Sequence, residues 1–343
     1  MTTPCRAWFL CLSLGLIAAT GVQAQTPPTE WRSSTPAEKS LDAAAFQDLD
    51  DTIAKDSADV QSVVVAQRGR VVYEYYRDGA PGTLRDVQSV MKSALSALVG
   101  VAIGQGRIAG LDQPVVTLVP EWAALNTDPR AAAITVRHIL TMTAGFAVND
   151  PTGTAGGLRP AEAWARPLRS APGESFAYDN ALIPMIAAVL EKVAGMPVPD
   201  YARKELLGPL DMEEPTYIRT MQMRTVDMAK LGQLFLQNGV WGGKQILPPS
   251  YATAATSQQN AGGAPVGMPY GYMWWIVPGA APRRTFMASG YAGQFIWVHP
   301  ESQLVIAGTS TVSPASQARG QMLALIRTRL FQAAQRRAAA DKP

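Results

Sequence analysis

Residues 86–106 read DVQSVMKSALSALVGVAIGQG, and this stretch decides how the rest of the chain is interpreted. After Asp86 it contains one charged residue, Lys92, and no other until Arg107. The remaining residues are almost all apolar or small, which is typical of a helix buried between layers. Ser89 and Lys92 lie three positions apart at its start, so their side chains share one helix face and can hydrogen-bond.

The Ser89–Lys92 pair has two interpretations. A serine hydroxyl becomes a nucleophile when a neighbour takes its proton, and a lysine can do so once burial and nearby charge have lowered its pKa. Backbone amides at a helix N-terminus also stabilise the negative charge of an acyl-transfer intermediate. A capping serine beside a lysine that snorkels to solvent fits the same spacing, and the motif alone favours this simpler interpretation.

The N-terminus has the pattern of a secretory signal peptide. Arg6 precedes an uncharged apolar run, and Val22-Gln23-Ala24 forms a small-residue cleavage site, so residues 1–24 are predicted to be removed. The apolar run is short for a membrane span, and no stable membrane insertion is expected afterwards. We therefore expect an exported protein, periplasmic or secreted. Both cysteines, Cys5 and Cys11, lie in the leader, which excludes disulfides and thiol chemistry in the mature chain.

Composition excludes several other classes of function. The formal net charge is +3 and there are two histidines, too few for a three-histidine zinc site. No metal or organic cofactor is expected. A basic cluster near the C-terminus (Arg327, Arg329, Arg336 and Arg337) fits a solvated helix face, and no aromatic residues are interleaved with it. We predict no nucleic-acid partner, and the sequence leaves the oligomeric state open.

Periodicity predicts an α+β fold. Helical spacing covers residues 37–58, and a β-hairpin follows at 62–67 and 71–76. Helices are expected at 89–105, 135–141, 181–193, 198–206 and 225–238, then strands at 272–277, 284–289, 294–298 and 304–309, and a final helix at 316–338. Strands at both ends predict one antiparallel sheet flanked by terminal helices, with a helical insertion. Residues 25–343 are expected to form a single domain, with the α/β part at 37–80 and 265–343 and the insertion at 81–264.

Two further motifs could complete a site. In FAYDNAL, Tyr178 and Asn180 alternate at a loop-to-helix junction, where a phenol can relay a proton and an amide can bind substrate; Asn180 could instead cap the next helix. In FMASGYAG, small residues including Ser289 and Gly290 end a strand, where a ligand could approach the backbone. The simpler interpretation of these glycines is a β-hairpin.

Together and in this order, Ser-x-x-Lys, Tyr-x-Asn and small-Ser-Gly are similar to the motif set of the serine β-lactamase and penicillin-binding-protein superfamily. The chain resembles its class C β-lactamase and esterase branch, most of all the 6-aminohexanoate-dimer hydrolase type. The resemblance includes GRIAGLDQPVVTLVPEW, ITVRHILTMTAGF, VDMAKLGQLFLQNGVWGGKQILPPSY and YGYMWWI, and it covers most of residues 63–310.

The resemblance implies a role for each matching residue. Ser89 would be the acylated nucleophile, Lys92 its proton-accepting partner, and Tyr178 a general base and acid. Asn180, Ser289 and Gly290 would contact substrate, and the backbone N–H groups of Ser89 and Tyr291 would form the oxyanion hole.

The chain departs from the family at three places. Ala288 stands where β-lactamases carry Lys or His to bind a substrate carboxylate, and the sequence leaves open whether Arg283 or Arg284 replaces that cation. Residues 142–145 read MTAG where many relatives have His-Thr-Ser-Gly, so His138 is interpreted as structural, like His299. The connection at 213–225 is short, which predicts a more open pocket.

Three functions are compatible with these residues. The first is an exported serine hydrolase, a carboxylesterase or linear amidase, that cleaves a small ester or amide through a Ser89 acyl-enzyme. The alternatives are a class C-type β-lactamase and a non-catalytic cell-envelope binding protein on the same scaffold. The natural substrate, whether ester, linear amide, β-lactam or cell-wall fragment, is not determined by the sequence.

Overall fold

The computed structural model describes Trp31 and residues 34–148, 157–217, 220–279 and 283–341. The predicted leader, residues 1–24, lies outside the described residues, as does part of the Gly- and Pro-rich loop at 145–160.

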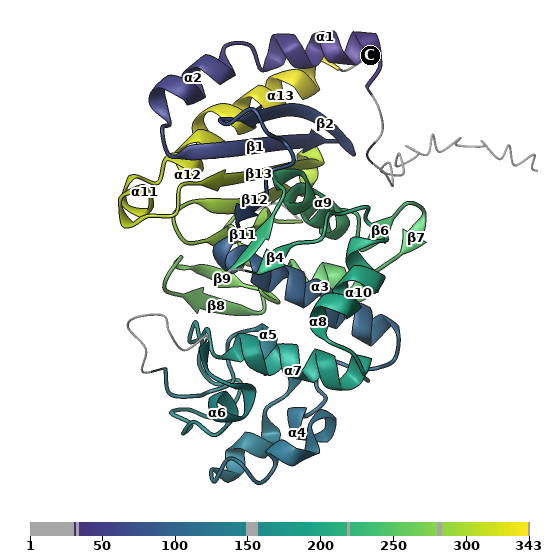
Figure 1. Ribbon diagram of the computed structural model, residues 1–343, viewed down its shortest axis with the longest axis vertical. Helices are drawn as coiled ribbons and strands as arrows, with labels where there is room; N and C mark the ends of the chain where they lie inside the picture. The colour runs from purple at the N-terminus through teal and green to yellow at the C-terminus, as the bar shows by residue number, and fades with distance from the viewer. Residues whose placement is uncertain (1–30, 32–33, 149–156, 218–219, 280–282, 342–343) are drawn as a thin grey trace, which may run out of the picture.

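An eight-stranded antiparallel sheet contains strands from both ends of the chain, as predicted (Figure 1). Its order is β2-β1-β13-β12-β11-β10-β9-β8. The strands are β1 (Val60–Gln67), β2 (Arg70–Tyr76), β8 (Asn260–Gly263), β9 (Met268–Tyr270), β10 (Trp275–Ile276), β11 (Phe286–Gly290), β12 (Gln294–His299) and β13 (Leu304–Ser310).

The first and last strands of the sheet in chain order, β1 and β13, are neighbours, with only β2 between β1 and the edge of the sheet. Val63 of β1 is opposite Gly308 of β13, and the hydroxyls of Ser62 and Thr309 are 2.5 Å apart although 247 positions separate them in sequence. Both β1 and β13 are almost wholly buried, because helices cover the two faces of the sheet.

The helices at the two ends of the chain cover one face of the sheet, in purple and yellow in Figure 1. The predicted helix at 37–58 is two helices, α1 (Pro36–Ala45) and α2 (Leu49–Asp56), because Asp48 adopts a left-handed φ of 62°. The predicted final helix is broken at Gly320. Its parts are α11 (Pro314–Arg319), α12 (Gln321–Leu325), the π-helical turn η7 (Ile326–Leu330) and α13 (Phe331–Ala340).

Arg337 corrects the prediction of a wholly solvated basic face. Its side chain is 2% exposed, and its Nε donates to Asp42 Oδ1 at 2.7 Å. The same carboxylate accepts from Nη2 of the buried Arg70 at 2.8 Å. Helical spacing alone cannot show that α13 packs against α1, and this contact turns Arg337 inward. The other three arginines of the cluster are exposed, as predicted.

Helix α9 (Thr225–Leu236) covers the opposite face of the sheet. A Cβ at Gly232 would lie 2.6 Å from Ile296 and 2.8 Å from Val305, so the glycine allows close packing on β12 and β13. Beyond α9 lies α3 (Met91–Gly104), buried on all sides from Lys92 to Ala102 as its apolar sequence predicts.

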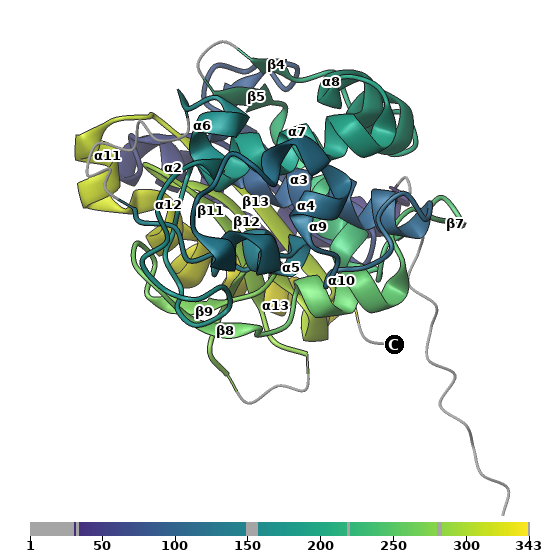
Figure 2. The ribbon, with the colours of Figure 1, turned by 90° about the horizontal axis from the view of Figure 1, so that it is seen from below.

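The remaining helices form the insertion, which lies at the lower end of the molecule in Figure 1 and in front of the sheet in Figure 2. They are α4 (Val115–Leu118), α5 (Val136–Leu140), α6 (Pro160–Trp164), α7 (Leu182–Ala194), α8 (Val198–Ala202) with its π-helical extension η5 (Arg203–Leu207), and α10 (Pro249–Ala255), with short 3-10 helices η1 (Gln88–Val90), η2 (Pro120–Trp122) and η3 (Pro129–Ala133). Two small sheets accompany them, β3 (Arg85–Asp86) with β4 (Thr216–Tyr217) and β5 (Met221–Met223), and β6 (Val240–Trp241) with β7 (Lys244–Gln245). A further 3-10 helix, η6 (Pro300–Ser302), lies outside the insertion and connects β12 to β13.

Across the described residues, no single helix is both long and apolar enough to cross a membrane. Helices α7 and α8–η5 meet the length and composition test only as a pair, bent by 69°.

Candidate active site

Ser89 lies in the tight turn η1, directly before α3. The Asp86 carboxylate fixes this turn by accepting from the backbone N–H of Gln88 at 2.9 Å and from its side-chain amide at 2.8 Å. Gln88 has a φ of 49°, in the left-handed region that costs a non-glycine residue energy. Such strain persists where surrounding contacts hold it, and it is frequent at functional sites.

Lys92 lies inside the protein and contacts Ser89. Its side chain is 5% exposed, and Nζ donates to Ser89 Oγ at 2.9 Å. A snorkelling lysine is therefore wrong for this chain. A capping serine is wrong as well, since the residue at the N-cap of α3 is Val90.

Tyr178 covers Lys92 from the other side of the site. The Lys92 Nζ lies 4.9 Å from the centroid of the Tyr178 ring, a cation–π contact. The ring stacks on Trp275 of β10 at 5.9 Å and 18°. Trp275 in turn contacts Tyr270 edge-on at 4.5 Å. This aromatic support was missed in the sequence analysis, because Trp275 was included there only as part of the stretch YGYMWWI.

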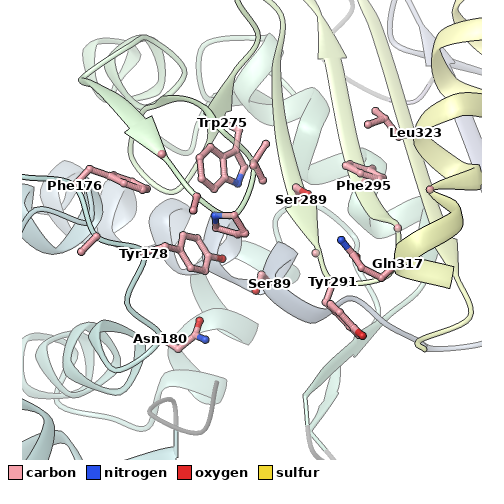
Figure 3. A pocket seen from close by; sticks show the side chains of 18 of the residues that line it. Ser89, Phe176, Tyr178, Asn180, Trp275, Ser289, Tyr291, Phe295, Gln317 and Leu323 are labelled. Atoms are coloured by element: carbon pink, nitrogen blue, oxygen red, sulfur yellow. The ribbon is translucent and has the colours of Figure 1, made fainter. Parts of the chain in front are cut away.

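Asn180 does not cap the following helix. The N-cap of α7 is Ala181, and the buried Asp179 instead holds the junction by accepting from the Ala181 N–H at 2.9 Å. Arg166 pairs with the second carboxylate oxygen of Asp179 at 2.6 Å. The Asn180 side chain is consequently left to line the cavity (Figure 3).

The end of β11 approaches the Ser89 turn closely. A Cβ on Gly290 would lie 2.7 Å from the Val87 carbonyl oxygen, so only glycine fits without displacement. Ser289, Gly290 and Tyr291 all line the cavity beside Ser89, while Ala288 is 2% exposed and pairs with Ile296 of β12. The same segment is also a hairpin turn, in which Gly293 has a φ of 98°. Both interpretations of these glycines therefore hold.

These elements surround a cavity of about 970 Å³ with Ser89 at its base (Figure 3). None of the described residues that line it carries a formal charge. They are Ser89, Val148, Phe176, Ala177, Tyr178, Asn180, Gly263, Ala264, Pro265, Val266, Trp275, Ser289, Gly290, Tyr291, Gly293, Phe295, Ser316, Gln317, Gly320 and Leu323.

Neither arginine near Ala288 supplies a cation to the cavity. Arg283 donates to the backbone carbonyls of Leu236 and Phe235 at 2.7 and 2.8 Å, at the C-terminus of α9. Arg284 donates to the Gln258 side chain at 2.8 Å. The short connection at 213–225 also stays away from the cavity in its described part. Its strand β5 instead supports the Ser89 turn, because the Val87 N–H donates to the Met221 carbonyl at 3.0 Å.

Both histidines have local structural contacts. His138 Nδ1 accepts from the Thr135 N–H at 3.1 Å at the start of α5, and burial lowers its pKa. His299 Nδ1 accepts from the Ser302 N–H at 3.3 Å, and its ring lies 4.9 Å from that of Phe331. Neither lines the cavity. Among the residues that the structure describes, no three His, Cys, Asp or Glu side chains are grouped to hold a metal ion.

A family model named Beta-lactamase matches residues 49–227, more than half of the chain. This segment contains the Ser89 turn, Lys92 and the Tyr178–Asn180 junction. The chain belongs to the Beta-lactamase family.

An esterase and two solved structures of hydrolases resemble the chain at low identity. Esterase EstB of Burkholderia gladioli is 27% identical over 185 residues, 45% of this chain and 46% of the esterase. A putative 6-aminohexanoate-dimer hydrolase from Bacillus anthracis superimposes with a TM-score of 0.67 at 20% identity, over 84% of this chain and 81% of that one. EstCE1, a hydrolase with promiscuous acyltransferase activity, superimposes with a TM-score of 0.68 at 18% identity, over 89% of this chain and 100% of that one.

The structural likenesses confirm the predicted fold. In sequence, the chain is similar to one named esterase, EstB.

Proposed function

We propose that this protein is a serine hydrolase that cleaves an uncharged ester or amide through an acyl-enzyme on Ser89. The observation that carries the proposal is the contact of 2.9 Å between Lys92 Nζ and Ser89 Oγ at the base of a cavity without formal charge among its described residues. A general base takes a proton across a heavy-atom distance of about 2.6–3.2 Å.

The proposed reaction uses the roles that the family resemblance implies for these residues. Lys92 takes the Ser89 proton as Oγ attacks the substrate carbonyl carbon, and the carbonyl oxygen becomes an oxyanion beside the N–H groups of Ser89 and Tyr291. Tyr178 relays this proton toward the leaving group. The C–O or C–N bond then breaks, and the leaving group receives the proton. Water cleaves the Ser89 ester by the same steps, releases the acid and restores the serine.

The cavity lining favours a neutral substrate over a β-lactam. A β-lactam carries a carboxylate, and a charge-assisted hydrogen bond to such a group contributes about 1.5–3 kcal/mol. Ala288 provides no cation, and Arg283 and Arg284 bond elsewhere. Aromatic and aliphatic side chains such as Phe176, Trp275 and Leu323 suit apolar acyl or alcohol groups instead.

The proposal is tested with a substrate panel and one variant. Purified mature protein is assayed on a neutral aryl butyrate, on the matching succinate ester with its added carboxylate, on a linear amide and on a chromogenic cephalosporin. We expect the butyrate to be preferred to the succinate by tenfold or more, roughly the effect of one charge-assisted contact, and Ser89→Ala to abolish turnover. Wild-type activity in Ser89→Ala would refute the proposal. Efficient cephalosporin turnover would favour the β-lactamase, and failure of a fluorophosphonate to label folded protein at Ser89 would favour the binding protein.

Export is part of the same proposal. Arg6, the apolar run after it and the Val22-Gln23-Ala24 site support cleavage after Ala24. Sequencing the N-terminus of protein from the periplasmic fraction would give Gln25 as the first residue if the leader is used. Full-length protein confined to the cytoplasm would contradict it.

A further inference from the structure

The turn after β11 carries the backbone N–H of Tyr291, one of the two groups assigned to the oxyanion hole. This turn has an unfavourable backbone conformation. Ala292 has a φ of 64° and is 1% exposed, and Gly293 follows with a φ of 98°. An alanine with a φ in the left-handed region is uncommon unless neighbouring groups hold that backbone conformation.

Two glutamines hold the two sides of one peptide group in this turn. The Tyr291 carbonyl accepts from Gln294 Nε2 at 3.2 Å, and the Ala292 N–H donates to Gln317 Oε1 at 2.6 Å. These are the C=O and the N–H of the same peptide, so its plane is fixed at both ends. The next peptide group toward the N-terminus carries the Tyr291 N–H.

Gln294, the first of these two glutamines, is anchored in the sheet. Gln294 is completely buried, its Nε2 also donates to the Ser310 carbonyl at 3.0 Å, and its Oε1 accepts from the Ser310 N–H at 3.0 Å. Its amide therefore takes the place of a strand partner at the end of β13. The turn is joined in this way to the end of β13.

Gln317, the second glutamine, comes from a separate part of the chain. Gln317 lies on α11, which Ser313 caps by accepting from the Ser316 N–H at 3.1 Å. Figure 3 shows Gln317 beside Tyr291, across the cavity from Tyr178 and Trp275, with Ser89 between them. The Gln317 side chain is exposed, so its contact with Ala292 is not a consequence of core packing.

We infer that Gln317 is a positioning residue that, with Gln294, orients the Tyr291 amide toward the oxyanion; this inference rests on the proposed function. An oxyanion-hole donor acts only when it points at the developing charge, and removing one costs about 10²–10³ in kcat in a well-studied protease. Acylation and deacylation both pass through an oxyanion, so a misdirected amide slows both steps.

The test compares Gln317→Met, which removes the acceptor at similar size, with Gln317→Glu, which keeps an oxygen for the Ala292 N–H. Hydrogen exchange at the Ala292 amide is measured first. We expect faster exchange in Gln317→Met, and slow exchange in both Gln317→Glu and the matched control Ala318→Met on the exposed side of α11. Equally slow exchange in Gln317→Met would refute the contact whether or not the protein is an enzyme.

The second measurement is kinetic and uses the neutral aryl butyrate with active sites titrated. In Gln317→Met we expect kcat per site to fall about 10- to 100-fold with KM within about twofold, and affinity for phenylboronic acid, a tetrahedral analogue, to fall in parallel. An unchanged kcat in Gln317→Met would overturn the inference. If KM rose while kcat stayed the same, Gln317 would be shown only to bind substrate. Absence of turnover in the wild type would refute the proposed function alone, since the exchange result stands by itself.

Discussion

The Lys92 Nζ atom lies 4.9 Å from the centre of the Tyr178 ring, and the same atom lies 2.9 Å from Ser89 Oγ. Tyr178 therefore has two separable parts, a ring that covers the lysine and a phenol hydroxyl at the cavity. Trp275 supports the ring by stacking, so the geometry of the pair depends on β10 as well as on the loop before α7.

We predict that Tyr178→Phe retains the fold and the position of Lys92 but lowers kcat by about 10²–10⁴, the usual contribution of a general acid or base. The ring remains and only the hydroxyl is lost. Steady-state kinetics with the neutral butyrate and a thermal melt measure the two effects. Tyr178→Ala, which loses the ring as well, should reduce activity further. A Phe variant as active as the wild type would exclude the phenol from the proton transfers.

We predict that Gly290→Ala lowers both activity and stability. The new methyl group would lie 2.7 Å from the Val87 carbonyl oxygen and 3.0 Å from Cβ of Gln88, so β11 or the Ser89 turn must shift. Overpacking of this kind costs about 1–3 kcal/mol, and a shift of the turn lowers kcat/KM by tenfold or more. Urea unfolding and ester kinetics measure these values. The matched control is Gly110→Ala, where no atom lies within 4 Å of the added carbon. Equal effects at the two glycines would contradict the close approach.

We predict that Asp42→Ala destabilises the protein by about 3–5 kcal/mol, because the buried Arg70 and Arg337 both lose a partner. Arg70 and Arg337 are 1% and 2% exposed. Chemical denaturation followed by circular dichroism provides the free energy of unfolding. The control is Asp51→Ala on the exposed surface of α2, which should change the free energy of unfolding by less than about 1 kcal/mol. A small loss in Asp42→Ala would mean that the two arginines find other partners.

We predict that the protein is less stable at pH 5 than at pH 7.5, partly through its histidines. Burial lowers the pKa of both His138 and His299 from the usual 6.5. The histidines of the unfolded chain therefore bind protons more readily than those of the folded protein. Their contribution to the free energy of unfolding is fully present above pH 6.5, and it is lost as the pH falls through the lowered pKa of the folded state. Urea midpoints at the two pH values measure the loss. The variant His138→Asn/His299→Asn should show a smaller difference, and an unchanged difference would contradict the assignment.

The parts predicted from the sequence are those with a local signal. The hairpin of β1 and β2 and the helices α3, α7 and α9 follow from hydrophobic periodicity, and Ser89, Lys92, Tyr178 and Asn180 follow from short motifs. The structure brings the motif residues to one site, while their catalytic roles are still predictions.

The features that were missed depend on contacts between distant segments. The inward turn of Arg337 requires α1, and the support of Tyr178 by Trp275 requires β10. The breaks at Asp48 and Gly320 require a backbone geometry that periodicity does not encode. Gln317 carries no motif, and only its contact with Ala292 makes it a candidate.

The pairing of β1 with β13 has a consequence for how the molecule is made. This pair joins a strand from the N-terminal part of the chain to the last strand, so the β2–β1 hairpin cannot join the rest of the sheet until β13 has been synthesised. Contacts of such long sequence separation slow folding and leave strand edges exposed in the meantime. The first half of the chain, which carries Ser89, is therefore synthesised before its sheet can be completed. We expect any activity of the proposed site to appear only after synthesis of the chain is almost finished.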